Sequence, residues 1–359
     1  MIIHSNCTYF RGDVPCNPHK LHGVHCDDCE FYEPKTGIIL IIKLGAVGDV
    51  IRTTPLLYRL KSDYPDSAIW WLTLTPDVVP AVVDKVLRFS PEALITLQAT
   101  HFDVLINLDK DIEACAIATI VYADEKKGFI LKHGKPTPVN TDTDHKFYTG
   151  LFDDISQANT KSYLQEIFEI CGWKFNGEEY ILDAPALGSS QILSEGKIII
   201  GLNTGCGERW VSRLWEFSRW EQLILLLIEN GYFPVLLGGK QEYDKNQELA
   251  AKTGAVCPPP TSLPEFIGLM NECDVVVTGV TMGLHIGIGL GKRIVVMNNI
   301  FNPHEFELYG RGEIVEPSKK CECYFRPTCI NPTYNCMEYL SVEQIFEAAK
   351  RQAAICSNS

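Results

Sequence analysis

Apolar, β-branched runs alternate along the first half of the chain with stretches of helical periodicity. Residues 38–42 form a continuous apolar run, which is typical of a strand buried on both faces. Further strands are predicted at 69–72, 104–108 and 127–130, and an alanine-rich helix is predicted at 111–120. Strands that alternate with helices predict a parallel sheet with right-handed crossovers.

A second alternation of the same kind begins near residue 197. Its strands are predicted at 198–202, 233–237, 275–278 and 294–297. Three stretches fit the capping box that begins a helix, namely 218–221, 262–265 and 341–344. Asn230-Gly231 is a typical helix end, so we expect the helix that begins at 218 to finish there.

The pattern divides the chain into four parts. Residues 184–196 are rich in glycine, serine and proline and are predicted to be a linker. We expect a cysteine-rich segment at 1–36, one α/β domain at 37–187, a second at 188–340, and a C-terminal helix at 341–359. Two such halves would enclose a cleft, and ligands of parallel sheets bind at the carboxyl ends of the strands.

Composition and charge exclude several classes of protein. Of the 359 residues, 46% are hydrophobic and 21% are charged, which indicates a globular protein rather than a disordered one. The net charge is 32 − 45 = −13, which disfavours nucleic acids and anionic membranes as partners. The sequence has neither an apolar run of membrane-spanning length nor a recognisable signal peptide, so we expect a cytoplasmic protein without a transmembrane segment.

Eight of the 14 cysteines fall into two clusters, which are Cys7, Cys16, Cys26 and Cys29, and Cys321, Cys323, Cys329 and Cys336. Without an export signal, clustered cysteines indicate metal ligands better than disulfides. Four thiolates suit structural zinc or iron. Reduced structural thiols, disulfides and one site shared by both clusters remain as alternatives. The alternative ligands are His19, His22 and His25.

Three glycine-containing loops follow predicted strands. The first places Gly45, Gly48 and Asp49 between a buried strand and a helix, where backbone amides can bind an anion. It lacks the third glycine of a dinucleotide fingerprint and the Gly-Lys-Ser/Thr of a P-loop, so a tight turn with Asp49 as a helix cap is equally consistent with it. The second loop, 201–215, combines glycines and a threonine with Arg213, and the alternative is a solvated loop. The third loop, 277–285, combines glycines and threonines with His285, and the alternative is a structural histidine.

The order of these loops resembles the heptosyltransferases of glycosyltransferase family nine. Gly-Asp-Val-Ile-Arg-Thr-Thr-Pro at 48–55 is similar to the first motif of that family. Asn-Thr-Gly at 203–205 with Arg-Leu-Trp at 213–215 is similar to its phosphate loop, and Gly-Gly-Lys-Gln-Glu at 238–242 is similar to its nucleotide-contacting strand end. The stretch that ends at His285 is similar to its Asp-Thr/Ser-Gly-x-x-His motif.

The resemblance implies a GT-B architecture of two Rossmann-like domains, with the acceptor domain first and the donor domain second. It implies Asp49 as the catalytic base. The residues that match substrate-binding positions are Gly48, Thr204, Gly205, Arg213, Glu242, Thr281 and His285. The sequence departs from the family at Val280 and Met282, where the family has aspartate and glycine, and this puts the identity of the donor and the retention of catalysis in question.

We therefore expect a transferase that moves a sugar from a nucleotide-diphospho-sugar, ADP-heptose or a related donor, by direct inverting displacement. The expected acceptor is a saccharide, a lipid-linked saccharide or a protein, and a homo-oligomer is among the expected assemblies. No catalytic metal is required, because Arg213 and loop amides can stabilise the leaving diphosphate. The alternatives are a nucleotide-sugar epimerase on the same fold and a non-catalytic, metal-bearing scaffold protein.

Overall fold

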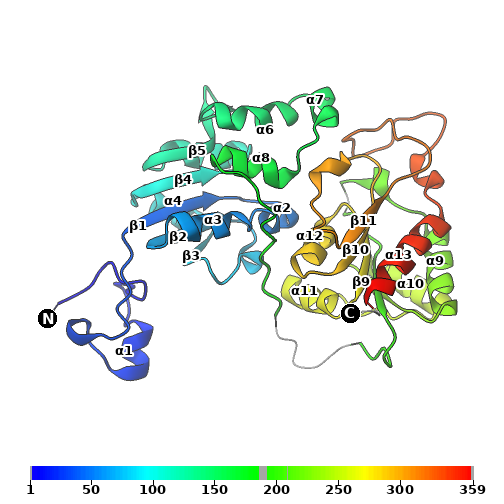
Figure 1. The fold of residues 1–359 in the computed structure, drawn as a ribbon, viewed down its shortest axis with the longest axis horizontal. Helices are drawn as coiled ribbons and strands as arrows, with labels where there is room; N and C mark the ends of the chain where they lie inside the picture. Colours follow the sequence, from blue (N-terminus) through cyan, green and yellow to red (C-terminus); the bar gives the residue numbers. More distant parts are fainter. Residues whose placement is uncertain (1, 186–191, 208, 357–359) are drawn as a thin grey trace. The chain divides into compact units, whose positions relative to one another are not determined.

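The computed structural model describes residues 2–185, 192–207 and 209–356 and divides the chain into two compact units (Figure 1). Unit 1 comprises residues 1–45, 53–147 and 167–174. Unit 2 comprises residues 46–52, 148–166 and 175–359. The short segment 46–52, which carries Asp49, therefore packs with the second unit although it follows the first strand of unit 1.

Unit 1 contains a six-stranded sheet with the strand order β3-β2-β1-β4-β5-β6. All neighbours are parallel except β5 and β6, which are antiparallel. The strands are β1 (Gly37–Ile42), β2 (Ser67–Thr73), β3 (Lys85–Arg88), β4 (Phe102–Asn107), β5 (Ala123–Lys132) and β6 (Lys135–Pro138). The four predicted strands are confirmed, whereas β3 and β6 are too short and too polar to have been recognised.

Helices α4 (Pro91–Gln98) and α5 (Ile112–Ile120) pack their apolar side chains against one face of this sheet. The shared core includes Leu40, Ile42 and Leu105 from the strands, all fully buried. Burial of β1 from Ile39 to Ile42 agrees with the continuous apolar run that predicted it.

Unit 2 contains a five-stranded parallel sheet with the strand order β11-β10-β9-β7-β8. The strands are β7 (Ile199–Asn203), β8 (Phe233–Leu237), β9 (Val275–Gly279), β10 (Arg293–Met297) and β11 (Gly312–Val315). Parallel pairing places Asn203 at the end of β7 beside Thr278 of β9. The four strands predicted here are confirmed, and β11 is an addition to them.

Helices α9 (Phe217–Glu229) and α13 (Val342–Cys356) share one hydrophobic core with strands β7 to β10. The capping boxes predicted at 262–265 and 341–344 are confirmed by reciprocal side-chain and backbone hydrogen bonds. The box predicted at 218–221 is wrong, because α9 begins one residue earlier, at Phe217, with Glu216 as its N-cap. The predicted helix end at Asn230 is confirmed.

The remaining helices surround these two cores or lie between them in the sequence. They are α1 (Asn17–His22), α2 (Val47–Ile51), α3 (Leu56–Asp63), α6 (Asp144–Thr149), α7 (Asp153–Ala158), α8 (Tyr163–Ile170), α10 (Tyr243–Thr253), α11 (Leu263–Asn271) and α12 (Met282–Gly289). No helix in the described part of the chain is both long and apolar enough to cross a membrane. Much of the linker predicted at 184–196, namely residues 186–191, lies outside the described residues.

Residues 2–36 form an N-terminal cysteine segment with almost no hydrophobic core. An antiparallel bridge between Cys7 and Pro34 joins its two ends, and Thr8 donates its N–H to the carbonyl of Glu33 at 2.8 Å. Pro18 is the only buried residue of this segment. Hydrophobic burial therefore contributes little to its structure.

Candidate active site

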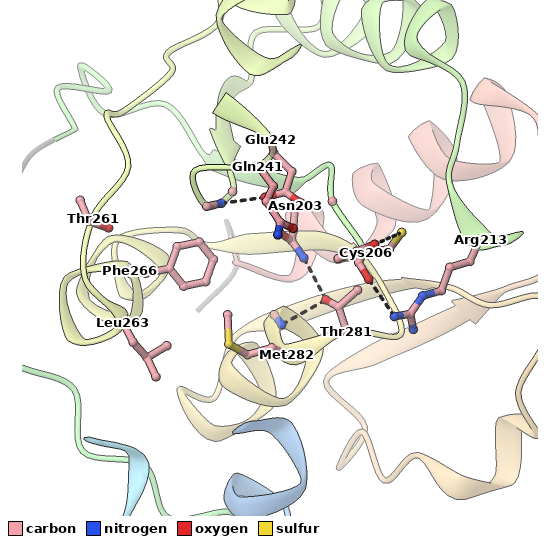
Figure 2. A pocket seen from close by; sticks show the side chains of 15 residues that line it. Asn203, Cys206, Arg213, Gln241, Glu242, Thr261, Leu263, Phe266, Thr281 and Met282 are labelled. Atoms are coloured by element: carbon pink, nitrogen blue, oxygen red, sulfur yellow. Dashed lines mark hydrogen bonds between the residues drawn. The ribbon is translucent and has the colours of Figure 1, made fainter. Parts of the chain in front are cut away.

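A cavity of about 440 Å³ opens where strands β7, β8 and β9 end and helix α12 begins (Figure 2). This is the edge of the sheet at which parallel α/β folds bind ligands. The residues that line it are Asn203, Gly205, Cys206, Gly207, Arg213, Gly238, Gly239, Gln241, Glu242, Thr261, Leu263, Phe266, Thr281, Met282 and Gly283.

The amino terminus of α12 forms one side of the cavity. The hydroxyl of Thr281 accepts the N–H of Gly283 at 3.1 Å and the side-chain amide of Asn203 at 2.9 Å, so the helix start is tied to the end of β7 (Figure 2). The Asn203 amide also donates to Thr278. A helix amino terminus at the edge of a cavity favours a negatively charged ligand such as a diphosphate.

Glu242 lies at the opposite side, after β8. Its carboxylate accepts the N–H of Gly239 at 3.0 Å, and its side chain packs directly on Gly205 and Gly238. A Cβ at Gly205 would overlap the Glu242 carboxylate, and a Cβ at Gly238 would lie 2.8 Å from the Glu242 Cβ. The two glycines are therefore needed for the carboxylate to reach the cavity.

Thr204 is placed beneath the cavity rather than along it. It is 3% exposed, and its hydroxyl donates to the Asn246 side chain at 2.6 Å. Lys245 donates to the Thr204 carbonyl at 2.8 Å, and burial lowers the pKa of Lys245. Thr204 thus anchors the loop to α10, and the two α10 residues were not singled out from the sequence because a helix interior gives no loop signal.

Arg213 enters the cavity from the 3₁₀ turn Val211–Arg213 and joins two loops. Its guanidinium donates to the carbonyl of Cys206 at 3.1 Å (Figure 2) and to the carbonyl of Val280. Within the described part of the chain, its Nε has no hydrogen-bond partner. Burial lowers the pKa of Arg213, which still remains a cation at neutral pH.

A second group of functional candidates surrounds the contact of α2 with α12. His285 is 7% exposed and lies directly against Gly48, where a Cβ would be 2.5 Å from the imidazole Cδ2. Tyr180 is in hydrogen-bond range of the His285 ring at 3.4 Å. Burial, with the positive charge of Arg52 as a smaller cause, lowers the pKa of His285 to about 3, so this histidine is neutral at pH 7.

Asp49 is held by both of its carboxylate oxygens. One oxygen pairs with the Arg52 guanidinium at 2.7 Å, and the other accepts the N–H of Ala46 at 3.3 Å. The Arg52 guanidinium also lies 3.5 Å above the ring of Tyr163. The Asp49 side chain is nevertheless 32% exposed, so the carboxylate is both fixed and accessible.

The predicted catalytic and substrate-binding residues, apart from Thr204, thus form two groups. Gly205, Arg213, Glu242 and Thr281 line the cavity after the β-strands, and Gly48, Asp49 and His285 meet at the α2–α12 contact. Helix α12 belongs to both groups, because Thr281 caps its start and His285 follows one turn later. Arg52 lies within the motif at 48–55 but was not singled out there, and Tyr180 reaches this second group only through the fold.

The two departures from the family pattern lie at this same helix start. The carbonyl of Val280 accepts a hydrogen bond from Arg213, and the side chain of Met282 lines the cavity. Position 280 therefore carries no negative charge although its backbone carbonyl binds the Arg213 guanidinium, and the thioether of Met282 occupies space in the cavity that a glycine would leave open.

The cysteines of the N-terminal segment gather around one small cavity of about 20 Å³. It is lined by all four predicted ligands, Cys7, Cys16, Cys26 and Cys29, together with His4, Tyr9, Phe10, Pro18 and Tyr32. Each thiol is free of disulfide bonding. Such a volume holds one water-sized particle.

The C-terminal cysteine loop (residues 321–336) brings its thiols into direct contact. The Cys323 thiol lies 3.6 Å from the sulfur of Cys329, and the hydrogen bond from Cys321 lowers the pKa of Cys336 to about 6. Three N–H groups donate to these sulfurs: Cys323 to Cys321 at 3.3 Å, Ile330 to Cys323 at 3.2 Å and Asn299 to Cys336 at 3.3 Å. Across the described residues, no group of three or more His, Cys, Asp or Glu has the geometry of a closed metal site.

Comparisons with known proteins agree with the fold. Residues 179–334 match the family model of glycosyltransferase family 9 (heptosyltransferase). No curated protein matches the chain significantly. A family 9 glycosyl transferase from Veillonella parvula shares 19% identity at a TM-score of 0.69, over 90% of this chain and 99% of that one.

Two Escherichia coli structures are similar as well. The ADP-heptose lps heptosyltransferase II shares 16% identity at a TM-score of 0.66, over 89% of this chain and 99% of that one. The iron-containing dodecameric glycosyltransferase TibC shares 12% identity at a TM-score of 0.55, over 90% and 80% of the two chains. The family match and the shared fold confirm the resemblance predicted from the loops: the chain is a glycosyltransferase that resembles family nine and has the GT-B fold.

Proposed function

We propose that the chain transfers a sugar from a nucleotide-diphospho-sugar to a hydroxyl group with inversion at the anomeric carbon. The observation that carries this proposal is the convergence of Arg213, Glu242 and the α12 amino terminus on one cavity in unit 2. A cation, a carboxylate and a helix start are complementary to a diphosphate joined to a ribose.

Each side of the cavity suits one part of the donor. The amides of Gly205 and Gly207, with the start of α12 and Arg213, suit the diphosphate, and Glu242 can accept ribose hydroxyls. Phe266 supplies an aromatic face that suits the base. An adenine nucleotide carrying a heptose, as in the relatives named for ADP-heptose, is the donor that we propose.

We assign Asp49 as the general base. Its partly exposed carboxylate can take the proton of the acceptor hydroxyl while that oxygen forms a bond to the anomeric carbon. The bond between the anomeric carbon and the diphosphate then breaks, and the nucleoside diphosphate leaves with the electron pair. Arg213 and the α12 amino terminus stabilise the charge that develops on it.

His285 acts in this scheme as a neutral group. It cannot supply a positive charge to the diphosphate, because its pKa lies near 3. We propose that its ring supports α2 through the contact with Gly48, and thereby sets the place of the Asp49 carboxylate relative to the donor cavity.

The cysteine clusters are proposed as structural zinc or iron sites. In the C-terminal loop three N–H groups donate to sulfur, and contacts of this kind stabilise thiolate ligands, which supports the proposal although the four thiols do not form a closed site in the described residues. In the N-terminal segment the four thiols line one cavity, and the segment buries little apolar surface that could stabilise it instead. A metal there would supply cross-links in place of a hydrophobic core.

We further propose a cytoplasmic enzyme that acts on a saccharide, a lipid-linked saccharide or a protein. Fourteen free thiols suit a reducing compartment. The dodecameric state of TibC is the reason for including a homo-oligomer in the proposal.

The test is a screen of nucleotide sugars by thermal shift, followed by mass spectrometry of the products with candidate acceptors. Transfer of a glycosyl unit from one donor supports the proposal. Turnover of the donor to an isomer without acceptor would establish an epimerase instead, and binding without any turnover would establish a non-catalytic protein.

A further inference from the structure

The turn that carries Arg213 is bonded to the C-terminal cysteine loop through Ser212. The Ser212 N–H donates to the Pro327 carbonyl at 3.0 Å, and its hydroxyl donates to the Arg326 carbonyl at 2.7 Å. The Ser212 carbonyl accepts the side-chain amide of Asn299 at 3.0 Å. Ser212 is 5% exposed, so these bonds satisfy all of its polar groups out of contact with water.

The same amide of Asn299 also reaches the sulfur of a cysteine. Its Nδ2 lies 3.0 Å from the Ser212 carbonyl and 3.3 Å from Cys336 Sγ. An asparagine amide has two N–H bonds, and here each of them has one acceptor. One planar group, placed directly after β10, therefore joins the cysteine loop to the residue that precedes Arg213.

Aromatic packing closes the same contact. The ring of Trp210 meets Phe325 and Phe301 edge to face, with centroids 5.4 and 5.6 Å apart. The Phe325 N–H donates to the Ile300 carbonyl at 2.9 Å. The Arg213 guanidinium lies 5.4 Å from the Phe301 ring, so the cation is positioned by the surface that the cysteine loop supports.

We propose that Asn299 is a positioning residue for donor binding: it ties Ser212 to Cys336 and so holds Arg213 in the donor cavity. Donor affinity then depends on the integrity of the cysteine loop. This inference rests on the proposed role of Arg213 at the donor diphosphate. It assigns no contact between Asn299 and the donor, since Asn299 does not line that cavity.

The decisive variant is Asn299→Asp. A carboxylate has nearly the same shape as the amide, but it cannot donate to the Ser212 carbonyl or to the Cys336 sulfur and it repels both. We use the nucleoside diphosphate, among ADP, UDP, GDP and CDP, that binds the wild-type chain most tightly. Calorimetry should show binding weakened at least tenfold, and the donor KM should rise while kcat changes less than twofold.

The matched control is Asn331→Asp. The Asn331 amide lies in the same cysteine loop but donates to Glu322, away from Ser212 and Cys336. The Asn331→Asp variant should bind the nucleotide with the same affinity as the wild type. A tenfold loss in this control would show that any disturbance of the loop weakens binding, and would overturn the specific role of Asn299.

A double-mutant cycle separates this inference from the proposed function. If Asn299 acts through Arg213, adding Asn299→Asp to Arg213→Ala should cost less than a further twofold in affinity. A second full tenfold loss would overturn the link. If Arg213→Ala alone binds normally, the donor role of Arg213 fails and the inference fails with it. If Arg213→Ala weakens binding and Asn299→Asp does not, only the role of Asn299 fails.

Should Asn299→Asp fold poorly, Ser212→Ala provides the second test. It removes only the hydroxyl bond to the Arg326 carbonyl and leaves the backbone bonds of Ser212 in place. Nucleotide binding should weaken about threefold to tenfold in this variant. Wild-type affinity in Ser212→Ala would overturn the proposed dependence of donor affinity on the cysteine loop.

Discussion

The imidazole of His285 occupies the space that a side chain at Gly48 would need. A Cβ there would lie 2.5 Å from His285 Cδ2 and 3.2 Å from Cγ. The contact joins the start of α2 to the interior of α12, so the position of the helix that carries Asp49 depends on the absence of a side chain at Gly48.

Gly48→Ala should therefore separate these two helices. We expect a loss of about 1–3 kcal/mol in the free energy of unfolding, the usual cost of overpacking a dense contact. The rate of sugar transfer should fall by more than this loss of stability alone would explain. The control is Gly45→Ala in the same loop, where the nearest atom to a new Cβ is a Leu74 methyl group at 3.9 Å. Equal melting temperatures for both variants would contradict the proposed contact.

Arg213 should matter for donor affinity through the shape of its side chain as well as its charge. We expect Arg213→Ala to weaken nucleoside-diphosphate binding about tenfold to hundredfold, because a forked donor to phosphate oxygens is lost. The affinity of Arg213→Lys should lie between those of the wild type and Arg213→Ala, because lysine keeps the positive charge but not the forked shape. Calorimetric titration measures all three proteins.

The control for this series is Arg209→Ala. Arg209 belongs to the same loop and is exposed, but it does not line the cavity. If the loss in Arg209→Ala matched that in Arg213→Ala, the general positive charge of the loop, rather than the Arg213 fork, would account for binding.

His285 should make the free energy of unfolding depend on pH. Its pKa is lowered to about 3 by burial and by the nearby charge of Arg52, against an opposing effect of Asp49. In the unfolded chain the pKa is near 6.5, so between pH 6.5 and 3 the unfolded state binds more protons and stability falls as pH falls.

From pH 7 to pH 5 the wild type should lose about 2 kcal/mol more than His285→Gln, because glutamine does not titrate. Urea unfolding at the two pH values gives the comparison. Parallel losses in both proteins would show that His285 takes up its proton in the folded state as readily as in the unfolded one.

The cysteine clusters should each retain metal independently. Protein purified anaerobically without added metal should contain about two equivalents of zinc or iron per chain by elemental analysis. Cys26→Ser should lose one equivalent and Cys323→Ser the other. Cys257→Ser is the control, because Cys257 belongs to neither cluster and should leave the content unchanged. Loss of both equivalents from either single variant would favour one site shared by the two clusters.

Strand periodicity predicted the sheets well because their residues are buried on both faces, as in β1 and β9. The edge strand β3 was missed because its four residues are exposed or only partly buried. The cavity residues Arg213 and Glu242 were predicted because they follow strands in loops. Arg52 lies within the motif at 48–55 but was not singled out, because the motif alone does not show that its guanidinium pairs with the Asp49 carboxylate.

The role of Thr204 could not be predicted from the sequence for a different reason. A threonine in a glycine-rich loop has the same pattern whether its hydroxyl contacts a ligand or the protein. Here the hydroxyl donates to Asn246, a residue of α10 that lies 42 positions later. A long-range partner of this kind is determined by tertiary packing, so spacing within the loop carries no information about it.

Asp49 can act as a catalytic base or only as part of the α2 start, and one variant distinguishes the two roles. Asp49→Asn keeps an oxygen that can accept the Ala46 N–H but removes the negative charge that pairs with Arg52. It also removes the base. We expect the variant to bind the donor nearly as the wild type does, to lose at most about 1 kcal/mol of stability, and to lose at least a hundredfold in transfer rate.

The control for the ion pair is Asp63→Asn, which removes a helical pair with Arg59 at 3.4 Å in unit 1 and should leave the transfer rate unchanged. The rate must be measured at saturating donor, so that a change in donor affinity cannot imitate a loss of base. Because general-base catalysis is typically worth about 10²–10⁴ in rate, a variant that retains more than a tenth of the wild-type rate would assign Asp49 to the structure of α2 alone. A large loss of melting temperature together with the loss of rate would point to the same structural role, since a base that is only removed leaves the helix start intact.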